Sequence, residues 1–351
     1  MGIKILHTAD WHLDAAFASF SDDRRSVLRR EQRKLPGRIA EICRREGCDL
    51  VLLAGDVFDG KPSREAVEAV RQGLKECGVP VFVSPGNHDF CGVGSPWLEE
   101  TWPENVTVFR GNLESVLIPE LDCRVYGAGY QSMDCAGLLE NFRAEGPEKY
   151  QLAVLHGDPV TARSPYCPIT AAQVRSSELD YLALGHIHKG GSFRAGKTLC
   201  AWPGCPMGRG WDETGEKGVC ITTLEETAET RFYPLNSIRF YDLEADVSEN
   251  AESVLDKMLP AADPENYYRV TMTGTAQPDV DALYRRYAGV NNLFLRDRTV
   301  PGENLWEDVG ADTFRGVYFK MLQAQAEKDP TAVLAAEISR KILSGREVVL
   351  P

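Results

Sequence analysis

The stretch that decides the fold is IKILHTADWHL, residues 3–13. It starts with a short apolar run typical of a buried strand, and Asp10 and His12 follow where such a strand would end. Residues two apart in an extended chain point to the same side. Ligands of α/β folds bind beyond the carboxyl ends of the strands. The stretch therefore predicts an α/β protein whose polar groups collect at one edge of a sheet.

The same arrangement recurs four times along the chain. A short apolar run at 50–54, 79–83, 152–155 or 181–184 precedes a cluster of Gly, Asp, Asn and His. The clusters are Gly55-Asp56-Val57-Phe58-Asp59, Gly86-Asn87-His88-Asp89, His156-Gly157-Asp158 and Gly185-His186-Ile187-His188. One such string could be an ordinary turn, but five in succession predict that these side chains converge on one rim. His7 lies inside the first strand, and we expect it to be a core histidine rather than a ligand.

Helical segments are expected at 24–46 and 63–76, the second beginning at Ser63. Strands alternating with helices favour parallel pairing and right-handed crossovers. Residues 106–126 and 192–233 instead show short strands with Gly and Pro turns. The pattern predicts an α/β fold with two sheets, an α/β/β/α sandwich over residues 1–236.

The pattern changes after residue 236. Strands expected at 238–245, 267–272 and 292–295, and helices at 251–259 and 279–287, indicate a small α+β domain over 237–310. Residues 311–351 form a C-terminal segment that is helical from 312 to 344 with a break at Pro330. Its apolar residues either pack on their own domain or dock a partner; they are Val317, Met321, Leu322, Val333, Leu334, Ile338 and Ile342.

Composition limits the choice of function. The 351 residues are 43% hydrophobic and carry a net charge of −13, which is unusual for a protein that binds nucleic acid alone. Residues 22–46 are locally basic, with nine basic and five acidic side chains, and they form either a solvated helix face or a phosphate contact. The chain contains no membrane span, no signal peptide and no CxxC pair among ten cysteines, so we expect a cytoplasmic protein with reduced thiols.

The converging residues form a nitrogen and oxygen ligand set without thiolates. Such a set favours Mn²⁺, with Fe²⁺ and Zn²⁺ as alternatives. Seven ligands are too many for one ion, so two divalent metal ions that share a carboxylate are expected.

In this order the motifs DxH, GDxxD, GNHD, H and GHxH resemble those of the calcineurin-like metallophosphoesterases, and they cover the first 235 residues. The sequence around them, at 6–13, 55–63, 184–189, 203–206 and 216–218, is similar to SbcD-type DNA repair exonucleases. Phosphoprotein phosphatases carry Asp-Arg-Gly after the GD motif and Glu after Asn-His. Phe58-Asp59-Gly60 and Asp89 stand here instead, which argues against that class.

The resemblance implies roles for individual residues. Asp10, His12 and His188 would hold the first ion, and Asn87, His156 and His186 the second, with Asp56 bridging them. His88 would be the general acid or a charge stabiliser, while Asp59 and Asp89 would orient a histidine ring or a loop. Nothing identifies substrate-binding residues. The family also implies a capping domain and a helical segment that docks on an SMC-like coiled-coil ATPase subunit.

Three functions follow from this sequence. The first is a two-metal-ion phosphodiester hydrolase, a DNA exonuclease or endonuclease subunit of a repair complex. The second is a metal-dependent phosphodiesterase or phosphatase acting on a small molecule or nucleotide, which the acidic charge favours. A non-catalytic scaffold is the third, although no ligand is missing. DNA and the ATPase are the expected partners, a homodimer stays open, and no membrane association is expected.

Overall fold

A computed structural model describes residues 2–300 and 305–344. The described residues divide into two compact units. The first comprises Met1–Leu243 together with Asp263–Arg269 and Val290–Phe294, and the second comprises Glu244–Ala262, Val270–Gly289 and Leu295–Pro351. No described helix has the length and apolar character needed to cross a bilayer.

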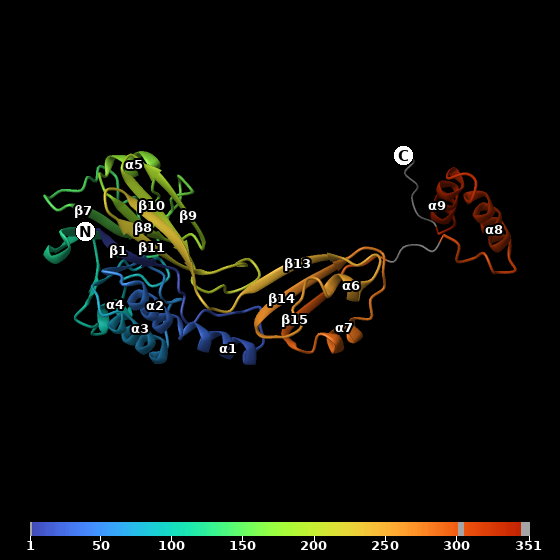
Figure 1. Cartoon of the computed structure of the whole chain (residues 1–351), viewed down its shortest axis with the longest axis horizontal. Helices are drawn as coiled ribbons and strands as arrows, with labels where there is room; N and C mark the ends of the chain where they lie inside the picture. Colours follow the sequence, from blue (N-terminus) through green and yellow to red (C-terminus); the bar gives the residue numbers. More distant parts are fainter. Residues whose placement is uncertain (1, 301–304, 345–351) are drawn as a thin grey trace. The chain divides into compact units, whose positions relative to one another are not determined.

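The first unit contains two six-stranded sheets (Figure 1). The first sheet has the strand order β12 (Ala228–Pro234), β11 (Gly218–Leu224), β1 (Ile3–Thr8), β2 (Leu50–Leu53), β3 (Val81–Val83) and β4 (Val106–Val108). Strands β1 to β4 pair in parallel, whereas β11 pairs antiparallel with both β1 and β12. The predicted parallel pairing of these strands is therefore confirmed.

The second sheet has the order β5 (Glu114–Ile118), β6 (Cys123–Gly127), β7 (Tyr150–His156), β8 (Tyr181–Gly185), β10 (Thr198–Gly204) and β9 (Lys189–Ala195). Its four inner strands are parallel, and the edge strands β5 and β9 are antiparallel to their neighbours. A 3₁₀ turn, η1 (Pro119–Leu121), connects β5 to β6.

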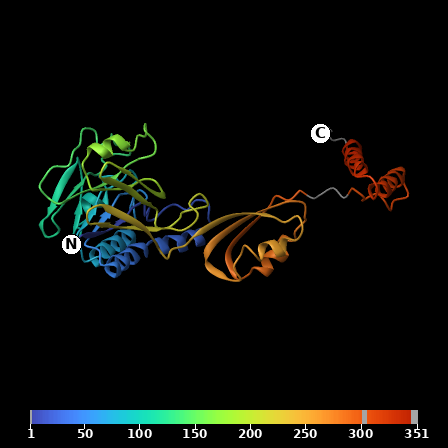
Figure 2. The same cartoon turned by 45° about the horizontal axis from the view of Figure 1, so that its top comes forward.

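Helices cover the outer faces of both sheets (Figures 1 and 2). Helices α2 (Leu35–Glu46) and α3 (Arg64–Glu76) pack on the first sheet, and α5 (Ala171–Ser176) packs on the second. Helix α1 (Asp22–Gln32) and the short α4 (Pro96–Glu99) complete the unit. The apolar layer between the sheets includes Ile5, Leu52 and Leu152. The α/β/β/α sandwich predicted from the sequence is confirmed.

One predicted helix is divided in two. Residues 24–46 were expected to be continuous, but α1 ends at Gln32 and α2 begins at Leu35. Pro36 lies in the first turn of α2, where its missing N–H is tolerated, whereas in a continuous helix it would remove a backbone hydrogen bond. Helix α3 starts as predicted, because the Ser63 hydroxyl caps it by accepting from the Ala66 N–H at 3.2 Å.

A third sheet has the order β13 (Phe240–Asp246), β14 (Asp263–Thr273) and β15 (Val290–Asp297), and the predicted helices occur as α6 (Ala251–Leu255) and α7 (Val280–Arg286). Farther along, α8 (Phe314–Ala326) and α9 (Thr331–Leu343) pack on each other, with Phe319 and Ala336 buried. The break at Pro330 is confirmed. Val317, Met321, Leu334 and Ile342 are exposed.

Candidate metal centre

The five polar clusters follow five strands of the two sheets. Three come after β1, β2 and β3 of the first sheet, and two come at or after the ends of β7 and β8 of the second. Asp10, His12, Asp56 and His156 are buried, although these residue types are mostly exposed in proteins. The structure thus brings distant segments of the sequence to one rim, as the sequence predicts.

The backbone at this rim is strained. Asp10, His12, Asp56 and His186 have positive φ angles of 54°, 46°, 50° and 88°. Such angles are uncommon for residues other than glycine, and strained residues cluster at functional sites. Gly55 also has a positive φ of 83°, and a Cβ there would lie 2.6 Å from His156 Nδ1. The turn after β2 therefore has no room for a side chain at this position.

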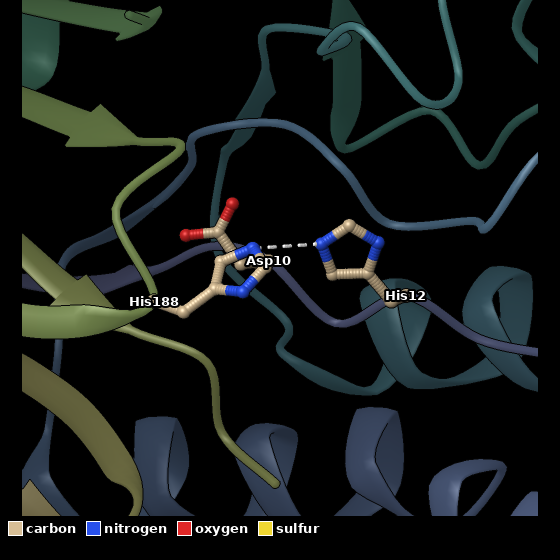
Figure 3. Close-up of side chains that lie close together, drawn as sticks. All are labelled: Asp10, His12 and His188. Carbon is tan, nitrogen blue, oxygen red and sulfur yellow. Dashed lines mark hydrogen bonds between the residues drawn. The ribbon is translucent and has the colours of Figure 1, made fainter. Parts of the chain in front are cut away.

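Asp10, His12 and His188 form the first candidate ligand group (Figure 3). The Nε2 atoms of His12 and His188 lie 3.1 Å apart. Two nitrogens that share one ion, each bound at roughly 2.1 Å, are about 3 Å apart. The spacing of the two rings therefore suits neighbouring positions around one cation.

Asp56 lies between two histidines. Its Oδ2 atom is 3.6 Å from His12 Nε2 and 3.4 Å from His156 Nε2. Asp10, Asp56 and His156 form a second candidate ligand group. One carboxylate oxygen next to two imidazoles from different strands has the arrangement that a bridging ligand needs.

His156 has its ring orientation set by the backbone. Its Nδ1 atom lies 2.9 Å from the Ala54 carbonyl oxygen and donates to it, so Nε2 faces Asp56 Oδ2 and, at 2.9 Å, Asn87 Oδ1. Burial opposes a charged ring, but the Asp56 carboxylate outweighs it and raises the pKa of His156 to about 9. Because the Asp56 and Asn87 oxygens are acceptors, His156 Nε2 must either carry a proton or share a metal ion with them.

His186 lies at the edge of the group. Its ring is edge-on to His156 at 5.3 Å between centroids and lies 4.9 Å from the ring of Tyr166. Its backbone N–H donates to Asp10 Oδ1 at 2.9 Å. Burial, together with the nearby His156, lowers the pKa of His186, so the ring stays neutral and can offer a lone pair.

The residues fit a divalent cation. Among the described residues, the buried Asp10 Oδ2 and His12 Nδ1 atoms have no hydrogen-bond partner. Leaving a buried carboxylate oxygen unpaired costs about 1–3 kcal/mol or more. A bound ion would satisfy that oxygen, and the buried carboxylates and neutral imidazoles are ligands that divalent metals use in proteins.

His88 differs from the other histidines because it is exposed. Its Nδ1 lies 2.8 Å from Asp59 Oδ1, and its backbone N–H donates to Asp56 Oδ1 at 2.9 Å. The hydrogen bond to Asp59 raises the pKa of His88. With Nδ1 held by Asp59, the Nε2 atom remains available to a substrate.

Asp89 stabilises loops rather than lining the rim. It is buried and accepts from the N–H groups of Gly86 at 2.8 Å and Val57 at 2.9 Å, and from the Trp97 indole at 3.0 Å. Burial, with the nearby Asp56 charge, raises its pKa to about 6. These bonds join the loops after β2 and β3.

Two charged residues that the sequence did not single out belong to this centre. Glu213 Oε1 lies 2.7 Å from His188 Nδ1, and Arg209 Nη2 lies 2.8 Å from the same oxygen. Hydrogen bonds from His188 and Arg209 outweigh burial and hold the pKa of Glu213 well below its usual range. Both residues lie in an irregular loop, and no strand or motif marked them in the sequence.

His7 is a core residue, as predicted. It is fully buried, with Nδ1 2.8 Å from the Tyr181 hydroxyl and Nε2 3.0 Å from the Leu184 carbonyl oxygen. Burial lowers its pKa to about 3. The ring is therefore neutral, accepting from Tyr181 and donating to Leu184.

The basic segment 22–46 makes mostly internal contacts. Arg33 pairs with Asp14 at 2.8 Å, and the Arg24 guanidinium lies 4.5 Å from the centre of the Phe294 ring. Eight of the nine basic side chains contact the chain itself: Arg24, Arg25, Arg29, Arg33, Lys34, Arg38, Arg44 and Arg45. This favours a structural role over a phosphate contact.

The chain is similar in sequence to a known family and to individual proteins. The calcineurin-like phosphoesterase family profile matches residues 3–190. The uncharacterized metallophosphoesterase YhaO of Bacillus subtilis is 32% identical over 241 residues, which cover 62% of this chain and 57% of that protein. The SbcD component of the SbcCD nuclease of Staphylococcus epidermidis is 23% identical over 316 residues, covering 78% of this chain and 80% of that protein.

Two solved structures show similarity at low identity. TT1561 of Thermus thermophilus aligns with a TM-score of 0.39 and 12% identity. A dimetal phosphatase from Danio rerio aligns with a TM-score of 0.43 and 16% identity. Each alignment covers 66% of this chain and 99% of the other.

Proposed function

Because the chain belongs to the calcineurin-like phosphoesterase family, we propose that it is a two-metal-ion phosphodiester hydrolase that cleaves DNA as the nuclease subunit of a repair complex. The proposal depends on the position of Asp56 Oδ2, which lies between the Nε2 atoms of His12 and His156. The similarity to the SbcD component of a nuclease extends over most of the chain and supports DNA as the substrate.

The ligand assignment is part of this proposal. Asp10, His12 and His188 would hold one ion, Asn87, His156 and His186 would hold the other, and Asp56 would be shared between them. Mn²⁺ is the proposed ion, because the set contains nitrogen and oxygen donors and no thiolate. When bound, the ions activate a water molecule and offset the charge that develops on the phosphate.

The chain itself supplies the proton for the leaving group. Asp59 accepts from His88 Nδ1, which favours the charged form of the ring and leaves Nε2 free to donate a proton. We assign the transfer of this proton to the leaving oxygen to His88. Asp59 orients His88, and Asp89 fixes the loop that carries it, so neither of them transfers a proton.

The later parts of the chain complete the proposal. Residues 237–310 would act as a capping domain that limits access to the centre, and residues 311–351 as a docking segment for a coiled-coil ATPase. The exposed apolar side chains of α8 and α9, among them Met321 and Ile342, support docking. A cytoplasmic location fits ten cysteines that are all free.

One observation favours a second candidate, a phosphodiesterase acting on a small molecule or nucleotide. The net charge is −13, and the basic segment 22–46 is mostly engaged in internal contacts. Such a protein would turn over a small phosphodiester and leave DNA intact.

Purified protein with Mn²⁺ and end-labelled duplex DNA distinguishes the two candidates. Cleavage by the wild type, lost after addition of a chelator and after Asp56→Asn, is the result expected for a nuclease. Turnover of bis-p-nitrophenyl phosphate without cleavage of DNA, alone or with a coiled-coil ATPase, would favour the small-molecule enzyme. Failure to bind Mn²⁺, Fe²⁺ and Zn²⁺ would leave only the scaffold.

A further inference from the structure

The loop between β10 and β11 holds a carboxylate against one of the candidate metal ligands. Glu213 is buried, with a side-chain exposure of 7%, and its Oε1 lies 2.7 Å from Nδ1 of His188. The other oxygen, Oε2, accepts from the backbone N–H of Arg209 at 2.8 Å and lies 3.7 Å from Cys205 Sγ. Both carboxylate oxygens are therefore fully used.

We propose that Glu213 is a positioning residue that sets the tautomer and orientation of the metal ligand His188, and that Arg209 clamps Glu213 in place. This inference rests on the proposed function, because it concerns how one side chain is prepared for an ion. It assigns a role to two residues that no motif identified.

The tautomer of His188 depends on the partner of its Nδ1 atom. A neutral imidazole carries its proton on only one nitrogen, and the other nitrogen offers the lone pair. The Glu213 carboxylate can only accept, and at 2.7 Å it is closer to Nδ1 than the Arg209 donor at 2.9 Å, so it favours the proton on Nδ1. The lone pair is then on Nε2, the atom that lies 3.1 Å from His12 Nε2 within the candidate ligand group. A carboxylate behind a ligating histidine fixes the ring in this way and makes it a stronger ligand.

Glu213 also keeps Arg209 from donating to His188 Nδ1. Its Nη2 atom lies 2.8 Å from Glu213 Oε1 and 2.9 Å from His188 Nδ1. If Glu213 were absent, the guanidinium would donate to Nδ1 instead and move the ring proton to Nε2. The lone pair would then point away from the ion. Glu213 thus prevents its own partner from selecting the wrong tautomer.

The loop is anchored at its centre. Trp211 lies between Arg209 and Glu213 and contacts the rings of Phe20, Phe240 and Phe294 at 5.9, 5.4 and 5.4 Å between centroids. Aromatic packing of this kind fixes the loop independently of the ion pair. A change at Glu213 can therefore alter His188 without releasing the whole loop.

The molecule offers a matched control. Glu148 pairs with Arg124 at 2.7 Å, and the pair has side-chain exposures of 7% and 25%, against 7% and 24% for Glu213 and Arg209. Glu148 lies just before β7, and its hydrogen bonds to Arg124 and Gln151 involve none of the candidate ligands. Glu148→Ala thus removes an equally buried ion pair that is not bonded to the proposed metal ligands.

The test measures the metal-free tautomer and the metal affinity separately from catalysis. Histidine ¹⁵N NMR of the metal-free protein should show His188 protonated on Nδ1 in the wild type, in Glu213→Gln and in Glu148→Ala, and shifted toward Nε2 in Glu213→Ala. Calorimetric titration with Mn²⁺ should show affinity reduced about 10- to 100-fold in Glu213→Ala, partly restored in Glu213→Gln, and unchanged in Glu148→Ala.

The possible outcomes distinguish the role of Glu213 from the proposed function. A wild type that binds no Mn²⁺ refutes the proposed function. A wild type that binds Mn²⁺, with Glu213→Ala showing the same tautomer and affinity, overturns the role of Glu213 and leaves the function standing. Equal losses of stability in Glu213→Ala and Glu148→Ala with no change at His188 would show a purely structural ion pair. If Glu213→Ala does not fold, Glu213→Gln is compared with the wild type instead, and unchanged Mn²⁺ affinity there overturns the inference.

Discussion

Replacing His88 with Gln should slow hydrolysis of phosphodiesters with poor leaving groups far more than hydrolysis of those with good ones. A general acid protonates the leaving oxygen, and its loss costs about 10²- to 10⁴-fold in rate. An aryloxide such as p-nitrophenolate leaves without a proton, whereas an alkoxide does not. The ratio of the two rates therefore isolates proton donation from binding and from charge stabilisation.

The contact with Asp59 sets the pH range of this effect. At the 2.8 Å between His88 Nδ1 and Asp59 Oδ1, two unit charges attract by about 1.5 kcal/mol in bulk water. Bulk water is the suitable limit because both side chains are partly exposed. Asp59 raises the pKa of His88, so the acid form persists to higher pH. Asp59→Asn should therefore move the fall in activity at high pH to lower pH.

The assay compares two thymidine phosphodiesters with Mn²⁺ across a pH series. One is the p-nitrophenyl ester of thymidine 5′-phosphate, and the other is a thymidine dinucleotide. His88→Gln should lose about 10²- to 10⁴-fold on the dinucleotide and far less on the aryl ester, with unchanged Mn²⁺ stoichiometry. Equal losses on both substrates, or the loss of one bound ion, would refute the general-acid assignment and make His88 a ligand or a charge stabiliser.

Three further predictions concern the ligands and the core. Asp56→Asn should abolish Mn²⁺-dependent hydrolysis and weaken Mn²⁺ binding while the metal-free fold persists, and a large drop in the melting temperature of the metal-free variant would show a structural role. Because Asp56 raises the pKa of His156 to about 9, binding of an ion must displace a proton from this ring. Calorimetry in buffers of different ionisation enthalpy should therefore detect proton release, and the affinity for the ion should fall on acidification. An affinity independent of pH would contradict this. His7→Ala should cost about 2–5 kcal/mol in urea denaturation, because the Tyr181 hydroxyl and the Leu184 carbonyl lose their partner. The pKa of His7 falls from 6.5 unfolded to about 3 folded, so the wild type should lose this stability as the pH falls from 6.5 toward 3, whereas the variant should not.

The local features of the fold could be predicted from the sequence. Short apolar runs define β1, β2, β3, β7 and β8, and Ser63 marks the start of α3, because burial and capping depend on residues close in the chain. The convergence of Asp10, Asp56 and His156 could also be predicted, since parallel strands place their carboxyl ends at one edge. The break between α1 and α2 was missed, although Pro36 was visible in the sequence.

Only the tertiary structure decided the surroundings of these residues. Glu213 and Arg209 lie in a loop without a repeating pattern, and their contact with His188 depends on how β8, β10 and β11 are arranged in space. The sequence could not distinguish Asp89 from Asp59, yet one is buried under backbone amides and the other faces His88. Short-range patterns determine which strands form and where they end, while the protonation and orientation of a side chain depend on neighbours that folding brings from elsewhere.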